Sequence, residues 1–424
     1  MQQKRKKAPI ALFTLLAVSG LFLFVIGCTG TAPVGWSGPL IDKQTLYIGD
    51  QKGELLALNL ENGNQRWAKE LVGPSKGGFG CFAPAQSSSA IYGTPAISDG
   101  IVYSASYNGK VYAFDASDGA QKWVYPPDKK ALKPIVSGPV VASGIVAFGD
   151  TDGKIYGLSA ADGTEKWVFP TQGKAWATPA TQNGILYVPS LDGHVYALKA
   201  SDGSPVWTSN RVGGIAARPA LSATTVYVGS LDNKLYAFDK ATGNMKWVFP
   251  GGNFFWAGPV LNDSLVIAAN TEGKVYGINA ETGQQAWVWA SPGQTSISST
   301  PTIVNGLVAV GSLDGKINII DTAKGQPVRD SIATGTTGET SIKGPLASRG
   351  NTVYARVESG KRAFVIGYDV TTGSQVMSKE LIAAIAPASE TPESTSFLNW
   401  QTILLIFALM VIAFLLVSRR SVKP

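Results

Sequence analysis

The sequence predicts an all-β fold, an eight-bladed β-propeller of four-stranded antiparallel blades. Three observations predict it. A unit of about 40 residues recurs eight times between positions 36 and 384, a glycine recurs at fixed turns of the unit, and a tryptophan follows the last turn in six copies. A single four-stranded meander cannot bury both of its faces. Stacking such units around a closed ring buries them, and a unit of this length is typical of propellers.

The copy that begins at Thr94 shows the pattern of one unit. Turns at Asp99-Gly100, Asn108-Gly109 and Asp118-Gly119 separate four short runs that are rich in β-branched and aromatic residues. Each run alternates apolar and polar positions, which predicts four antiparallel strands joined by tight turns. Residues 36–384 are therefore expected to form one domain, although a linear solenoid of the same units is the alternative.

The turns recur at matching places in every copy. The last turn has Gly63, Gly119, Gly163, Gly203, Gly243, Gly283, Gly325 and Gly373, and four positions later come Trp67, Trp123, Trp167, Trp207, Trp247 and Trp287. The middle turn has Gly53, Gly109, Gly153, Gly193, Asn233, Gly273, Gly315 and Gly360. Asparagine is the residue that most readily replaces glycine where the backbone must be left-handed, so Asn233 fits such a turn.

The N-terminal residues have the pattern of a secretion signal. Four basic residues, 4–7, precede an apolar run that ends in Val25-Ile26-Gly27-Cys28. This arrangement predicts a signal peptide over residues 1–27, and the last four residues resemble a bacterial lipobox, which makes Cys28 the expected site of lipidation. Residues 28–35 would then be a lipidated linker. An uncleaved signal anchor is the alternative, because the apolar run is long enough to span a bilayer.

The C-terminal residues predict a membrane anchor. The run 397–417 is 21 residues long and uncharged, and a basic tail, 418–424, follows it. Since positive charge stays in the cytoplasm, the tail is expected inside the plasma membrane and the propeller on the extracytoplasmic side. The polar, proline-containing segment 385–396 is expected to be a disordered spacer.

The charge distribution argues against nucleic-acid binding. The net charge of +7 equals the seven basic residues of the two ends, so the rest of the chain between them is neutral and has no basic footprint. A single histidine and two cysteines also weigh against a zinc site and against histidine catalysis. His194 occupies a turn position where other copies have lysine. We therefore expect no catalytic residue, no metal site and no cofactor.

The pattern acid-x-x-[Thr/Asp]-Gly-x-x-x-Trp, as in residues 239–247, resembles the tryptophan docking motif of the pyrroloquinoline-quinone (PQQ) repeat family. The resemblance implies an eight-bladed propeller in which each of these tryptophans packs between neighbouring blades. The quinone dehydrogenases of the family hold their cofactor with an adjacent pair of cysteines and a calcium site. Here Cys28 and Cys81 are far apart, and no set of acidic residues stands out from the repeat.

A closer resemblance is to the propeller lipoproteins of the outer-membrane β-barrel assembly machinery. It covers the lipidated N-terminus and the eight blades with these repeats, and it implies a scaffold without catalysis. The predicted C-terminal helix departs from that group. It leaves a direct role at an outer-membrane machine open, and a cell with a single membrane fits the sequence equally well.

Aromatic residues recur three positions before the proline that opens each innermost strand. The set comprises Trp36, Tyr92, Trp176 and Trp256, with Phe255 beside the last of these. Equivalent positions of a closed propeller lie on one circle, so these side chains are expected at the channel mouth, where they form either a partner-binding face or a cap on the core between blades.

The expected function is that of a membrane-anchored, extracytoplasmic scaffold that binds other envelope or membrane proteins without catalysis. Two other functions stay open. One is a PQQ-dependent dehydrogenase or sensor, which needs a calcium site and a cofactor roof. The other is a cell-surface adhesion or carbohydrate-binding module, for which the aromatic set is the support.

Overall fold

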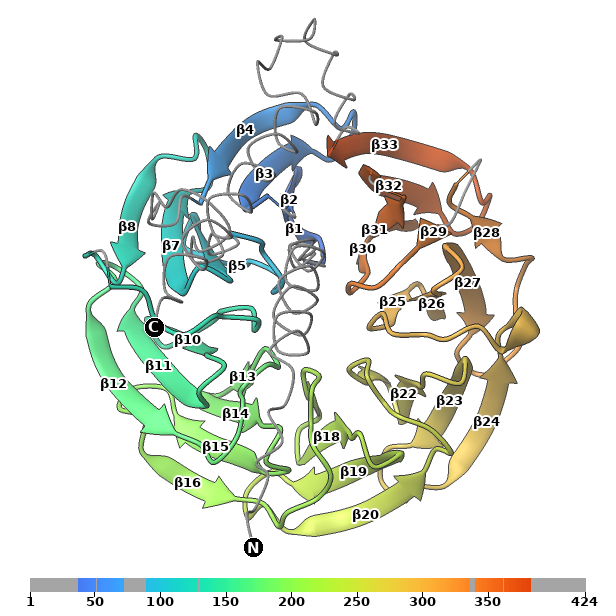
Figure 1. Cartoon of the computed structure of the whole chain (residues 1–424). Helices are drawn as coiled ribbons and strands as arrows, with labels where there is room; N and C mark the ends of the chain where they lie inside the picture. Colours follow the sequence, from blue (N-terminus) through green and yellow to red (C-terminus); the bar gives the residue numbers. More distant parts are fainter. Residues whose placement is uncertain are drawn as a thin grey trace, which may run out of the picture. The chain divides into compact units, whose positions relative to one another are not determined.

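The computed structural model describes residues 37–50, 52–71, 89–128, 130–335, 340–360 and 362–382. These residues form a ring of eight sheets, as predicted, and each sheet is built from consecutive strands (Figure 1). Blade 1 comprises β1 (Leu40–Asp42), β2 (Thr45–Gly49), β3 (Glu54–Asn59) and β4 (Gln65–Glu70), and blade 2 comprises β5 (Ala96–Ser98), β6 (Ile101–Ser106), β7 (Lys110–Asp115) and β8 (Gln121–Tyr125). Blade 3 comprises β9 (Val140–Ala142), β10 (Ile145–Gly149), β11 (Lys154–Ser159) and β12 (Glu165–Pro170), and blade 4 comprises β13 (Ala180–Gln182), β14 (Ile185–Pro189), β15 (Val195–Lys199) and β16 (Pro205–Thr208).

The second half of the ring repeats this order, with one short 3-10 helix between blades 6 and 7. Blade 5 comprises β17 (Ala220–Leu221), β18 (Thr225–Gly229), β19 (Lys234–Asp239) and β20 (Met245–Pro250), and blade 6 comprises β21 (Val260–Asn262), β22 (Leu265–Ala269), β23 (Lys274–Asn279) and β24 (Gln285–Ala290). Then follow η1 (Pro292–Gln294) and blade 7, with β25 (Thr302–Val304), β26 (Leu307–Gly311), β27 (Lys316–Asp321) and β28 (Ile332–Ala333). Blade 8 comprises β29 (Thr340–Ser341), β30 (Ala347–Arg349), β31 (Thr352–Ser359), β32 (Arg362–Asp369) and β33 (Gln375–Ile382).

The two middle strands of each blade are buried on both faces, because neighbouring blades cover both. All five residues of β18 are buried, as are the central residues of β19. Continuous apolar runs suit such positions. The alternation expected from the sequence is thus wrong for the middle strands. Outer strands such as β24 expose every residue except Trp287 and Trp289, the first buried and the second half-buried.

The middle turns need a left-handed backbone, as the glycine pattern predicted. Asn233 has a φ of 71°, and Gly193 at the same turn of blade 4 has a φ of 90°. Space is equally restrictive at Gly193, since a Cβ there would lie 2.1 Å from the carbonyl oxygen of Val212. A larger side chain would therefore strain both the turn and the connection beside it.

Six indoles join neighbouring blades. Each Nε1–H donates to a backbone carbonyl of the next blade over 2.8 to 3.1 Å: Trp67 to Ala116, Trp123 to Ala160, Trp167 to Ala200, Trp207 to Lys240, Trp247 to Ala280 and Trp287 to Thr322. The rings pack on glycines. A Cβ at Gly157 would lie 2.1 Å from the Trp167 ring, and one at Gly203 of the next blade 2.6 Å from it. Glycine on both sides lets the indole fill the space between two sheets.

The last two junctions use other side chains. Arg329 stands where the tryptophan would be in blade 7, and its Nη1 donates to the Thr371 carbonyl at 3.2 Å. Met377 of blade 8 contacts the turn at Gly63 of blade 1. No strand is exchanged across this closure among the described residues, so side-chain packing closes the ring.

The closure between blades 8 and 1 is a hydrophobic cluster with one buried cation beside it. Four leucine and isoleucine residues of β2 and β3 pack with Tyr354, Val365 and Met377. Arg356 is buried and donates from Nη1 to the Gly49 carbonyl at 3.1 Å. A buried guanidinium needs such partners because it loses its water.

Several predicted segments lie outside the described residues. They are the signal peptide or anchor 1–27, Cys28 with the linker 28–35, Trp36, the spacer 385–396, the helix 397–417 and the tail 418–424. Within the part that the structure describes, no helix has the length and apolar character needed to cross a membrane.

We predict that the docking indoles contribute strongly to stability. Trp167→Ala removes a buried ring and its hydrogen bond to the next blade, and truncation of a buried tryptophan costs about 3–5 kcal/mol. The melting temperature measured by calorimetry should fall by several degrees. Trp167→Phe keeps most of the ring contacts and should fall less. Equal melting of Trp167→Ala and the wild type would refute a structural role for this ring.

Acidic residues at the last turns predict acid sensitivity. The carboxylates of Asp162, Asp202, Asp239 and Asp369 accept hydrogen bonds from turn residues two or three positions later, as from Thr164 N–H at 3.1 Å. The Thr164 backbone N–H, followed by side-chain hydroxyls, lowers the pKa of Asp162 to about 2. Similar hydrogen bonds lower the pKa of the other three.

A lowered pKa stabilises the folded chain above the unfolded pKa near 4, and this stability is lost as the pH falls towards 2. Melting temperature should therefore decrease over that window. Asp162→Asn should melt lower at neutral pH and lose part of this pH dependence. The control Asp263→Asn, at a turn of blade 6 where no described residue bonds to the carboxylate, should keep it. Identical pH profiles for the two variants would contradict the assignment.

Candidate functional site

The connections between blades converge on a cavity of about 120 Å³ at the ring axis. Each connection runs from the outermost strand of one blade to the innermost strand of the next. The position three residues before the strand-opening proline contributes Tyr92, Val136, Trp176, Ala216, Trp256 and Ser298 to the cavity wall. We call this cavity and its rim the channel mouth.

The aromatic residues of the predicted partner face differ in exposure. Trp176 and Trp256 are half-buried and line the cavity. Lys174 stacks its Nζ 5.0 Å from the centre of the Trp176 ring. Tyr92 also lines the cavity, but its ring is mostly buried against Tyr107, and burial raises its pKa to about 12. The two tryptophans therefore offer the accessible aromatic surface.

Phe255 is placed differently from the prediction. Its side chain is 0% exposed and packs on the backbones of Gly229 and Gly251, whereas Phe254 is 47% exposed. Phe255 therefore belongs to the hydrophobic cluster between blades 5 and 6, and including it in a partner face was wrong. The same repeat position is buried and mostly aliphatic in five other connections: Ile91, Ile135, Ala175, Ile215 and Ile297. Aligning that position in the sequence would have placed Phe255 correctly.

Blade 8 is shifted by one residue at this position. The N–H of Ile342 donates to the Ser312 carbonyl, as that of Phe255 does to Ser230, and Ile342 is fully buried. Consequently Lys343 takes the place that the aromatic residues hold elsewhere, and it lines the cavity. In this copy the cavity residue therefore lies two positions before the proline, and not three as in the other copies.

Arg218 is a cavity residue that sequence reasoning missed. It directly precedes the proline of blade 5, and its exposed side chain lines the cavity. The other copies have glycine or threonine at this position: Gly38, Thr94, Gly138, Thr178, Gly258, Thr300 and Gly344. Two of these threonines accept backbone N–H groups, as Thr178 does from Gly138 at 2.8 Å and Thr300 from Gly258 at 3.2 Å. A charge at a position otherwise held by small residues was the available signal.

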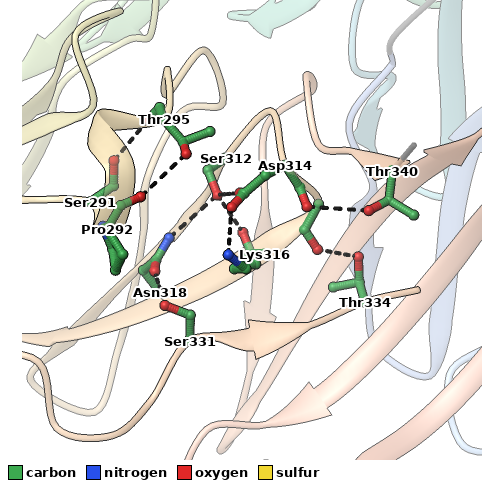
Figure 2. Close-up of polar contacts among 11 residues, drawn as sticks. Ser291, Pro292, Thr295, Ser312, Asp314, Lys316, Asn318, Ser331, Thr334 and Thr340 are labelled. Atoms are coloured by element: carbon green, nitrogen blue, oxygen red, sulfur yellow. Dashed lines mark hydrogen bonds and ion pairs between the residues drawn. The ribbon is translucent and has the colours of Figure 1, made fainter. Parts of the chain in front are cut away.

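Two of the middle turns carry a lysine that pairs with an acidic residue of the same turn. Figure 2 shows the turn of blade 7, where Lys316 Nζ lies 2.8 Å from Asp314, and Asn318 and Ser331 extend the polar network. Lys274 pairs with Glu272 at 3.1 Å in the same way. Exposed pairs of this kind contribute ~0–1 kcal/mol each, so they shape these two turns and add little to the stability of the ring.

The described residues hold no group of three histidine, cysteine or acidic side chains that could bind a metal ion. The His194 ring forms a hydrogen bond of 2.8 Å through Nδ1 to the Ser209 carbonyl, and its centre lies 5.9 Å from that of the tilted Tyr196 ring. It thus forms part of a turn. Cys81 lies outside the described residues.

Comparison with known proteins gives a consistent result. A family model described as outer membrane protein assembly factor BamB, of the PQQ repeat type, matches residues 83–190, 171–254 and 191–392. The outer membrane protein assembly factor BamB of Salmonella typhimurium is 32% identical over 100 residues, which is 23% of this chain. This match spans 24% of that relative, about a quarter of its length.

Two crystal structures share the fold. BamB from Moraxella catarrhalis superposes with a TM-score of 0.61 and 22% identity over 78% of this chain and 92% of that one. The computationally designed Ika8 protein superposes with a TM-score of 0.63 and 18% identity over 81% of this chain and 95% of its own. Because the family model covers well over half of the sequence, the chain belongs to the PQQ-like propeller family of the outer membrane protein assembly factor BamB.

Proposed function

We propose that this protein is a non-catalytic scaffold of the cell envelope that binds other proteins through the channel mouth. The observation that carries the proposal is the convergence of Trp176 and Trp256 on one axial cavity, with Phe254 exposed nearby in sequence. Half-buried tryptophans on a rigid frame make good anchors for a partner, since they bury a large area and lose little entropy.

Family membership supports the partner class. The relatives are named as assembly factors for outer membrane proteins, so envelope proteins are the partners that we infer here. Fold alone does not determine chemistry, so the proposal depends on the site.

We also propose that the propeller is tethered to a membrane on its extracytoplasmic side. The support is the sequence of the two ends, with lipidation at Cys28 and a helix over 397–417 followed by basic residues. A tether at both ends would hold the ring close to the bilayer. It would also favour partners that are themselves in or at the membrane.

We expect Trp176→Ala and Trp256→Ala to weaken partner binding with little change in stability. An anchoring tryptophan at an interface is worth about 2 kcal/mol or more, and these side chains are only half-buried. The full-length protein would be used to capture partners from detergent-solubilised membranes, with calorimetry on the same samples.

The matched control is Trp289→Ala, because Trp289 is also half-buried but lies on the outermost strand of blade 6. It should retain all partners. Retention of partners by both cavity variants would refute the proposed face. A large drop in their melting temperature would instead show that these rings serve packing between blades.

A second prediction concerns the dehydrogenase alternative. With PQQ and calcium added, the protein should oxidise no alcohol or sugar in a dye-linked assay, because the sequence lacks the adjacent cysteine pair and the described residues lack an acidic cluster. Turnover that depends on both additions would overturn the scaffold proposal.

A further inference from the structure

The two charged side chains that line the cavity are both positive. Arg218 and Lys343 are the charged residues of the cavity wall, and no acidic residue of the described chain lines it. Lys343 is neutralised by Glu358, whose carboxylate is 2.6 Å from Nζ. For Arg218, the described residues provide no hydrogen bond and no ion pair. One cation therefore faces the cavity without a counter-ion.

Arg218 has no counter-ion among the described residues. Part of its side chain is exposed, but neighbouring atoms of the channel wall desolvate the guanidinium, and this lowers the pKa of Arg218, although arginine stays charged in proteins. Other copies have glycine or threonine here, so the blade geometry does not require a long cationic side chain. A group that arrives from outside would supply the missing negative charge.

Other polar groups of the same wall are also without partners. Trp176 Nε1 and Ser298 Oγ are buried and form no hydrogen bond with any described residue, and both residues line the cavity. Buried polar atoms in native proteins are normally paired, which makes two such atoms beside an unpaired cation unusual. The wall thus has donor capacity that the described chain leaves unused.

We propose that the channel mouth binds a carboxylate of an extended protein segment, either an acidic side chain or a chain end, with Arg218 as its counter-ion. This inference rests on the proposed function of the same face. A guanidinium can hold a carboxylate with two parallel hydrogen bonds. The cavity of about 120 Å³ exceeds the ~10–15 Å³ that one water needs, so it admits a side-chain group.

The surroundings favour a protein segment over a free small anion. Trp176 and Trp256 lie in the same wall as Arg218, and they offer apolar contacts that a bare carboxylate would not use. Residues that flank the acid in a peptide would use them. The recognised chemistry is therefore an acidic residue beside apolar ones.

The test uses full-length protein and a displayed library of random heptapeptides. Peptides selected by the wild type should be enriched in aspartate, glutamate or a free C-terminus beside apolar residues, and Arg218→Gln should lose this enrichment. The matched control Arg211→Gln removes an exposed arginine that donates to the Asp192 carbonyl and does not line the cavity. It should select the same peptides as the wild type. Absence of acidic enrichment with the wild type would overturn the inference.

A synthetic copy of the best peptide then gives the magnitude. Replacing its acid by the amide, or Arg218 by Gln, should weaken binding more than about tenfold in fluorescence polarisation, the loss expected when a charged hydrogen bond is removed. Arg218→Lys should recover part of the affinity. Equal affinity for the acid and the amide would refute carboxylate recognition.

Free glutarate identifies the source of the carboxylate. It should compete only at far higher concentration than the peptide, and equal potency would overturn the assignment to a protein segment. The inference can also fail separately from the proposed function. If partner capture requires Trp176 and Trp256 but the selected peptides show no preference for acids, the proposed binding face is supported and the carboxylate inference is refuted.

Discussion

Each of the first six blades is joined to the next by an indole that fills the gap between two sheets and donates to a carbonyl on the far side. The contact depends on glycine in the turn of the neighbouring blade, because a Cβ at Gly203 would collide with the Trp167 ring. Tyr47, Tyr103 and Tyr227 of the second strands donate their hydroxyls to the same carbonyls as the indoles of their own blades: those of Ala116, Ala160 and Ala280. One carbonyl oxygen of a blade therefore accepts two hydrogen bonds from the preceding blade. These hydrogen bonds restrict the angle between the two sheets in addition to the packing of the ring.

That regular frame determines what the axis can offer. Since the connections repeat, their side chains meet on a small circle, and small changes of residue type there alter the cavity without altering the blades. Arg218 shows this clearly, because its neighbours on the circle are threonines and glycines that serve the backbone. Specificity can thus be placed at the axis while stability is supplied at the circumference.

The sequence predicted the fold well because the determining pattern is local and repeated eight times. The period, the glycine turns and Asn233 all agree with the structure. The site was harder to predict, because it depends on which way single side chains turn. Phe255 is buried, as are the residues at the same position of five other connections between blades, and only that comparison reveals it. Ile342, the buried residue of the last connection, is one residue closer to its proline than the others. Arg218 went unnoticed because the residue directly before the proline was not compared across the eight copies, where its charge stands out.

The join between blades 8 and 1 has a consequence for how the chain can be cut. Every sheet of the described residues is made from strands that are adjacent in sequence, so none of these sheets is shared between blades 8 and 1. The ends could be moved to another connection between blades by circular permutation, and each blade would remain whole. In propellers that close by sharing a sheet between both ends, the same operation must break a sheet. In this propeller every described blade would keep all of its strands after such a permutation.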